Sequence, residues 1–209
     1  MTPDLLTALV LFAFAASITP GPNNIMLLAS GANFGLRRTV PHMLGISLGH
    51  AVMTSLVGLG LIGLFDLVLW LRPALMLGCA VYLLYLAWKI ATAAPPPEAE
   101  DVATGRPLTF VQAAAFQWVN PKAWYMAIYA QTNFAPDGGL WGITWAGAVV
   151  VALVFAATNL PSVTVWAWGG TQLRRWLSAP GRLRAFNITM ALLLVASLWP
   201  ILRTGWTDG

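Results

Sequence analysis

Long apolar stretches alternate with short polar ones along this chain, and the pattern predicts membrane-spanning helices. A helix that crosses a bilayer needs about 20 predominantly apolar residues. Six stretches meet this requirement, at residues 4–29, 39–65, 67–90, 109–131, 141–168 and 185–203. We therefore predict an all-α integral membrane protein with six transmembrane helices.

The composition supports this fold class. Of the 209 residues, 58% are apolar and only 9% are charged, whereas a soluble domain carries about 25% charged residues. The single cysteine, Cys79, excludes an intrachain disulfide, and the sequence offers no Cys/His cluster for a metal. We expect neither a cofactor nor a metal centre.

Prolines and glycine interrupt some of the predicted spans beside asparagines. The first span contains Thr19-Pro20-Gly21-Pro22-Asn23-Asn24, and the fourth contains Asn120-Pro121-Lys122. We also expect an interruption of the fifth span at residues 159–161. Non-helical backbone at membrane depth is tolerated only where it is buried in protein or lines a cavity. Transporters build substrate sites from such broken helices.

The spans fall into two groups of three, separated by a polar, proline-rich stretch. We predict a first repeat at residues 1–91, a cytoplasmic linker at 92–108 and a second repeat at 109–209. Because three is an odd number, a second copy enters the membrane from the opposite side, which gives an inverted repeat. The broken first and fourth helices then correspond. The alternative is six unrelated helices with scattered prolines.

The basic residues predict the orientation of the helices. The loops of one side hold most of them, and the other side holds Arg72 and Arg203. Cytoplasmic loops carry an excess of Lys and Arg, so the first side is predicted to be cytoplasmic and both termini periplasmic. The residues of the cytoplasmic side are Arg37, Arg38, Lys89, Arg106, Arg174, Arg175, Arg182 and Arg184.

Lys122 is the one charged side chain deep inside a predicted span, and no Asp or Glu lies at that depth. A charge near the bilayer centre costs at least ~2.5 kcal/mol, so we expect Lys122 to face a cavity. Its ammonium group can hold a substrate carboxylate or carry a proton. The alternative is that Lys122 extends to an interface. His50 is the other candidate for proton coupling, although a buried histidine can also simply be hydrogen-bonded.

The helix breaks provide the rest of the candidate substrate site. A helix that restarts after a break presents unpaired N–H groups, which suit a carboxylate. The alternative is a kink whose asparagines satisfy freed carbonyl groups. The predicted substrate-binding residues are Pro20, Gly21, Pro22, Asn23, Asn24, Asn120, Pro121, Lys122 and Asn159. Gly45 and Gly49 form a G-x-x-x-G step, for which we expect helix packing.

Several of these motifs resemble the LysE/RhtB family of amino-acid exporters. The run Ser17–Asn24 is similar to the first-helix signature of that family, and Gly45–His50 is similar to its continuation. Leu77–Lys89 resembles the third helix, and Phe116–Ala123 resembles the motif around N-P-K-A. The resemblance implies a six-helix carrier of the bacterial inner membrane that exports amino acids, driven by the proton gradient. It is compatible with homo-oligomers.

The charges inside the spans favour a neutral substrate. An exporter of lysine or arginine would offer an intramembrane carboxylate to the substrate's side chain, and this chain has none. We therefore expect small neutral amino acids such as threonine, homoserine or branched-chain amino acids. The alternatives are cationic amino acids, other small amino-acid-like metabolites and a non-transporting membrane subunit.

An enzyme is not expected, because no nucleophile, base and orienting group occur together. The expected partners are a small-molecule amino-acid substrate and membrane lipid, without nucleic acid.

Overall fold

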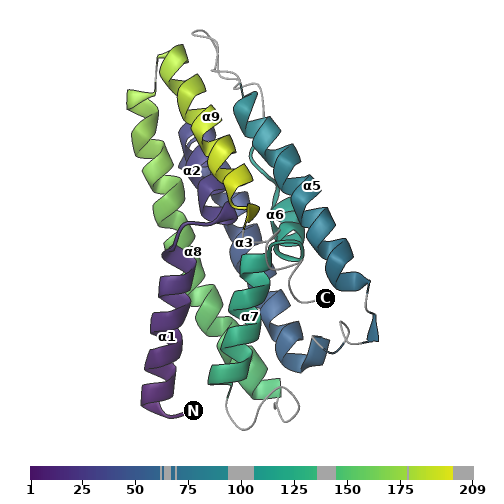
Figure 1. The fold of residues 1–209 in the computed structure, drawn as a ribbon. Coiled ribbons are helices and arrows are strands. Elements are labelled where there is room, and N and C mark those ends of the chain that lie inside the picture. The colour runs from purple at the N-terminus through teal and green to yellow at the C-terminus, as the bar shows by residue number, and fades with distance from the viewer. Residues whose placement is uncertain are drawn as a thin grey trace.

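The computed structural model describes residues 1–61, 63, 67–68, 70–93, 106–135, 145–177 and 179–199, and the regular elements among them are all helices (Figure 1). This confirms the predicted all-α class. Most of the predicted linker, at residues 94–105, lies outside the described residues. The elements are α1 (Pro3–Ile18), α2 (Pro22–Phe34), α3 (Leu36–Leu56) with a following π turn η1 (Val57–Leu61), α5 (Leu71–Ala91), α6 (Phe110–Gln117), α7 (Pro121–Phe134), α8 (Trp145–Trp176) and α9 (Pro180–Ala196).

Among the described residues, three helices are long and apolar enough to cross a membrane. They are Leu36–Leu61, Pro73–Ala91 and Trp145–Arg174, and α1 with α2 forms a fourth candidate span that bends by 56° at its break. These four coincide with predicted stretches. The α6–α7 pair and α9 occupy the other two stretches.

The two predicted helix breaks are confirmed, and the local sequence explains both. Thr19, at the end of α1, has extended backbone, as does Gly21, and Pro22 starts α2 at a position where its missing N–H costs nothing. In the second break α6 ends at Gln117. The side chain of Asn120 then caps α7 by accepting a hydrogen bond from the Lys122 backbone N–H at 3.2 Å.

The predicted interruption of the fifth span is wrong. Helix α8 is continuous from Trp145 to Trp176, with Pro161 inside it. A proline removes a single backbone donor, and hydroxyl groups of the turn after Pro161 bond carbonyls of the turn before them. Ser162 Oγ donates to the Thr158 carbonyl at 2.8 Å, and Thr164 Oγ1 donates to the Leu160 carbonyl at 2.7 Å.

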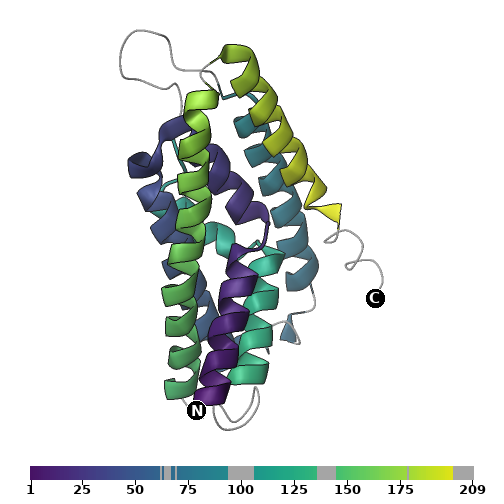
Figure 2. The same cartoon turned by 90° about the vertical axis from the view of Figure 1, so that its left-hand side faces the viewer.

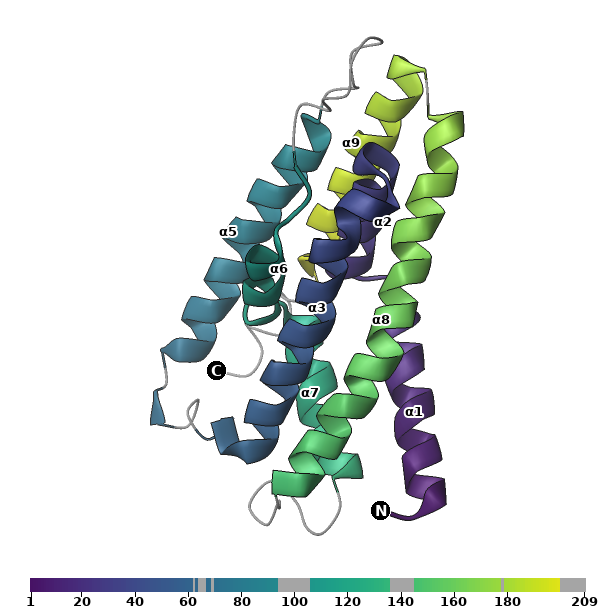
Figure 3. The same cartoon turned by 180° about the vertical axis from the view of Figure 1, so that it is seen from behind.

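The long helix α8 organises the bundle. Helix α1 lies along its first half and α2 along its second half (Figure 2), while α3 crosses the same helix and also packs on α6 (Figure 3). The strongest packing therefore joins elements from before and after the predicted linker. Figure 1 also shows opposite chain directions: α1–α2 runs away from the end that holds the N-terminus, and α6–α7 runs toward it.

Glycines allow these helices to approach closely. A Cβ at Gly31 would collide with the backbone carbonyl of Ala167 in α8, and one at Gly170 would collide with that of Leu28 in α2. The packing role expected for Gly45 and Gly49 is confirmed, because a Cβ at Gly49 would lie 2.6 Å from Ala114 Cα in α6.

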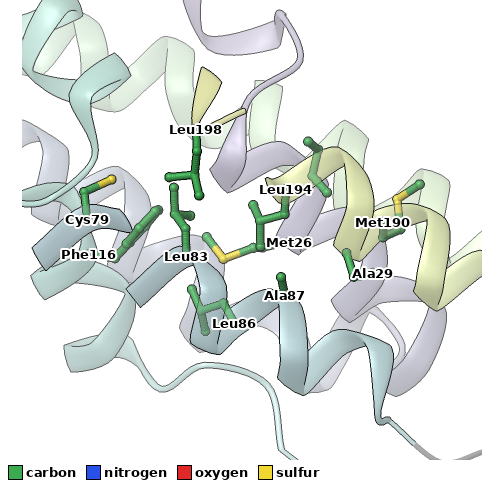
Figure 4. Close-up of a cluster of buried hydrophobic side chains, with 12 residues drawn as sticks. Met26, Ala29, Cys79, Leu83, Leu86, Ala87, Phe116, Met190, Leu194 and Leu198 are labelled. Carbon is green, nitrogen blue, oxygen red and sulfur yellow. The ribbon is translucent and has the colours of Figure 1, made fainter. Parts of the chain in front are cut away.

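An apolar cluster fills the space between α2, α5, α6 and α9 (Figure 4). Phe116 from α6 and Leu83 from α5 meet there, and Met26 from α2 faces Leu194 from α9. Cys79 is buried in the same cluster. This packing joins α5 and α9, the third helices of the two predicted repeats.

The basic side chains gather at one end of the bundle, which we call the basic end. Arg37 and Arg38 begin α3 there, Lys89 lies in the last turn of α5, and Arg182 lies in the first turn of α9. The N-terminus lies at the opposite end (Figure 1).

We predict that Gly31→Ala disrupts the contact between α2 and α8, because backbone atoms on both sides cannot relax around the added methyl group. The apparent melting temperature of the detergent-solubilised protein should fall, or folded protein should be lost. Gly181→Ala in α9 is the matched control, since nothing lies within 4 Å of its added Cβ, and it should be neutral or slightly stabilising. Equal melting temperatures for the two variants would contradict the close approach.

Candidate functional site

The two helix breaks meet in the middle of the protein and are joined by side chains. Asn23 Nδ2, in the first turn of α2, donates to Gln117 Oε1 at the end of α6 at 2.9 Å, and Gln117 Nε2 donates back to Asn23 Oδ1 at 3.3 Å. The ammonium group of Lys122, in the first turn of α7, donates to the backbone carbonyl of Thr19 at 2.7 Å. Residues about 100 positions apart in sequence thus form one polar site.

The carbonyl groups at the end of α1 receive several donors. Asn24 Nδ2 donates to the carbonyls of Ser17 at 2.9 Å and Thr19 at 2.7 Å, and Trp166 Nε1 of α8 donates to the Ile18 carbonyl at 3.0 Å. A helix C-terminus carries a partial negative charge. These carbonyls therefore offer the Lys122 ammonium a favourable environment without any carboxylate among the described residues.

Gly21 provides the space in which Lys122 lies. A Cβ at this position would be 2.9 Å from Lys122 Cδ and 3.2 Å from its Nζ. The lysine side chain therefore passes directly over the extended backbone of the first break. Lys122 is half-buried and contacts this break.

Asn159 lies on the same site from α8 and connects three helices. Its Nδ2 donates to Ser17 Oγ in α1 at 3.2 Å, and its Oδ1 accepts from Ser47 Oγ in α3 at 2.9 Å. Asn159 therefore bonds neighbouring helices and also lies beside the cavity described below.

His50 completes the site from α3. One ring nitrogen lies 3.3 Å from the Ala123 carbonyl at the start of α7, and the other lies 3.4 Å from Thr54 Oγ1. Its ring is also 5.1 Å from that of Phe155. His50 is buried and spans the space between the second break and α8.

A cavity of about 20 Å³ lies between these groups, and we call it the central cavity. This volume accommodates about one water molecule, so the structure is a closed form of the site. Seven of the ten predicted site and coupling residues line this cavity, namely Gly21, Asn23, Asn24, His50, Asn120, Lys122 and Asn159. Pro20, Pro22 and Pro121 belong to the breaks and do not appear among the lining residues.

Four polar residues of the site were not among the predicted ones: Ser17, Ser47, Gln117 and Trp166. Gln117 is fully buried. A polar residue inside an apolar span, three residues before Asn120, was the sequence signal that could have identified it. Ser17 likewise precedes the first break. Ser47 and Trp166 carry no comparable signal, because only the packing of α3 and α8 against α1 brings them to the breaks.

Comparison with known proteins agrees with these features. The family model described as LysE type translocator matches residues 14–197. The chain belongs to this family. LysE family proteins are amino-acid translocators integral to the membrane, which confirms the exporter class and the family resemblance.

Curated relatives include the cysteine/O-acetylserine efflux proteins of Escherichia coli (strain K12) and Shigella sonnei (strain Ss046). Each is 33% identical over 199 residues, which cover 93% of this chain and 96% of the relative. No solved structure matches.

We predict that Asn24→Leu destabilises the break, because carbonyls of Ser17 and Thr19 lose their amide donor at a buried position. A buried acceptor left unpaired costs about 1–3 kcal/mol, which should appear as a lower apparent melting temperature in detergent. Asn133→Leu is the matched control, since this exposed amide bonds only the Tyr129 carbonyl of its own helix. A melting temperature for Asn24→Leu no lower than that of the control would contradict the assigned role.

Proposed function

We propose that this LysE family protein is a secondary transporter that exports small neutral amino acids across the bacterial inner membrane. The observation that carries the proposal is the hydrogen bond from the Lys122 ammonium to the Thr19 carbonyl. This bond joins the ammonium group of α7, in one broken helix, to the C-terminal end of α1, in the other. A substrate carboxylate is a better partner for that cation than a neutral carbonyl.

The central cavity favours a zwitterion with an uncharged side chain. None of its described lining residues is acidic, and Lys122 is the cation among them. The substrate carboxylate can bind Lys122 and the amides of Asn23 and Asn24. The substrate ammonium group can donate to the carbonyls of Thr19 and Pro20. A second positive charge on the substrate would meet Lys122 without a counter-ion. The relatives are named for cysteine and O-acetylserine, whose side chains are both uncharged near neutral pH.

The proposed transport cycle requires the closed cavity to open. At about 20 Å³ it has no room for an amino acid, so substrate entry must separate the two breaks and free Lys122 from Thr19. Six transmembrane helices in two inverted repeats would supply such a motion by rocking of one half against the other. The opposite directions of α1–α2 and α6–α7 support this arrangement (Figure 1).

Proton coupling would use groups that already line the cavity. Lys122 and His50 are the titratable side chains among the described lining residues, and His50 contacts the first turn of α7 through Ala123. A change in protonation would then act on the helix that carries Lys122.

With the basic end in the cytoplasm, the N-terminus would be periplasmic.

We predict that Lys122→Met abolishes exchange of radiolabelled L-cysteine in proteoliposomes kept under reductant. Methionine occupies the space over Gly21 but offers no charge to a carboxylate. Arg182→Gln at the basic end should retain wild-type exchange. Elution of the variant as a single folded species in size-exclusion chromatography separates loss of transport from loss of fold. Wild-type exchange by Lys122→Met would eliminate the proposed role of this lysine.

Substrate charge gives a second test of the proposal. Uptake into inside-out vesicles should occur with L-cysteine, O-acetyl-L-serine or L-threonine, and L-lysine at equal concentration should neither be transported nor compete. The reason is that the described lining residues of the central cavity include no carboxylate that could pair with the lysine side chain. Transport of L-lysine together with failure of all three neutral amino acids would overturn the neutral assignment.

A further inference from the structure

A second and larger cavity opens at the basic end. It has a volume of about 260 Å³, against about 20 Å³ for the central cavity, and we call it the basic-end cavity. Helices α2, α3 and α5 enclose it together with residues 106–108, which precede α6. In the closed form described here, this cavity has room for a small amino acid and the central one does not.

His42 of α3 gives the basic-end cavity a binding group. Its side chain lines the cavity but is only 1% exposed, and neither buried ring nitrogen has a hydrogen-bond partner among the described residues. Because both nitrogens are covered in this form, a ligand in the cavity reaches them only after a local shift of the surrounding side chains. Buried polar atoms are nearly always paired. Neighbouring polar groups follow this rule: Asn33 exchanges hydrogen bonds with Asn187 at 2.9 and 3.2 Å, and Ser30 bonds Thr39 at 2.8 Å. His42 is the exception.

A zwitterion satisfies both nitrogens of such a histidine. Neutral imidazole has one N–H donor and one acceptor nitrogen, so it can donate to a carboxylate and accept from an ammonium group. The charges around the cavity favour the carboxylate, since Lys89 and Arg106 are exposed lining residues and none of the described lining residues is acidic. Met26 and Leu86 add an apolar wall.

The two cavities lie along one face of α2. Met26, Ser30 and Asn33 line the basic-end cavity at helical spacing, and Asn23 of the central cavity lies one turn before Met26 on the same face. The reciprocal bonds between Asn23 and Gln117 lie at this junction. A substrate that leaves the basic-end cavity along α2 therefore meets the pair that joins the two breaks.

We infer that the basic-end cavity is an intake site, in which His42, Lys89 and Arg106 bind a small zwitterionic amino acid before it reaches the central cavity. The inference rests on the proposed export function and extends it by a second substrate site. Substrate would reach the His42 ring through a local shift at the basic-end cavity, without separation of the two breaks.

His42→Phe is the decisive variant. Phenylalanine keeps an aromatic ring at the position, and no hydrogen bond seen in the structure is lost, so the apparent melting temperature should not fall. A hydrogen bond to a charged group contributes enough that its loss should weaken binding about tenfold or more. The KM for L-cysteine uptake into inside-out vesicles should rise by that factor with little change in kcat. An unchanged KM would show that His42 only packs and would overturn the inference.

Two cations at the basic end form a matched pair for a test of this site. Lys89 lies over the Tyr85 ring at 5.7 Å and Arg182 lies over the Trp176 ring at 5.4 Å, but only Lys89 lines the basic-end cavity. Lys89→Gln should raise the KM for L-cysteine, and Arg182→Gln should not. Equal effects of the two variants would indicate general attraction by the basic end and would count against a site at Lys89.

Equilibrium binding separates the intake site from the proposed central site. Radiolabelled L-cysteine should still bind detergent-solubilised Lys122→Met, which cannot transport, and should be lost from the double variant with His42→Phe. If Lys122→Met transports normally, the proposed central role fails while this assay still tests the intake site. If Lys122→Met binds no L-cysteine, or binds it equally with and without His42, the intake site is wrong.

Discussion

The rest of the structure depends on one constraint: the backbone carbonyls at the end of α1 must be satisfied at a depth where lipid provides no donors. Pro20 and Pro22 prevent the helix from continuing, so its last carbonyls lack their usual partners. Asn24, Trp166 and Lys122 supply the donors, from α2, α8 and α7. The helix break therefore fixes the positions of three other helices around it.

The same constraint explains why a lysine can lie among these helices without an acidic partner. Its charge is stabilised by the partial negative charge of the α1 C-terminus, which is weaker than a carboxylate would be. A strong ion pair would hold the two breaks together permanently. In the proposed cycle a carbonyl partner would instead be exchanged for the carboxylate of a substrate, because a carboxylate is the stronger partner for an ammonium group.

Local sequence chemistry was sufficient to predict the parts of the fold that a proline, an asparagine or a charge determines. Both breaks, the cavity position of Lys122 and the packing of Gly45 and Gly49 follow from such residues. Pro161 shows the limit: a proline inside an apolar helix resembles the other breaks in sequence, but nearby hydroxyls and the packing of α2 and α3 on α8 keep that helix continuous. The reciprocal bond between Asn23 and Gln117 could not be predicted either, since it depends on how two distant segments pack.

The distribution of satisfied and unsatisfied polar groups supports the different roles proposed for the two cavities. At the central cavity the described donors are engaged with backbone carbonyls or with each other, so a substrate must replace existing bonds in order to bind. At the basic-end cavity the ring nitrogens of His42 form no hydrogen bond with the described residues, so a ligand would break none there. Binding there costs no protein hydrogen bond, whereas binding at the breaks requires their separation. In the proposed cycle this difference orders the two events: a substrate would first bind at His42 after a local shift, and its carboxylate would compete for Lys122 only when the breaks separate.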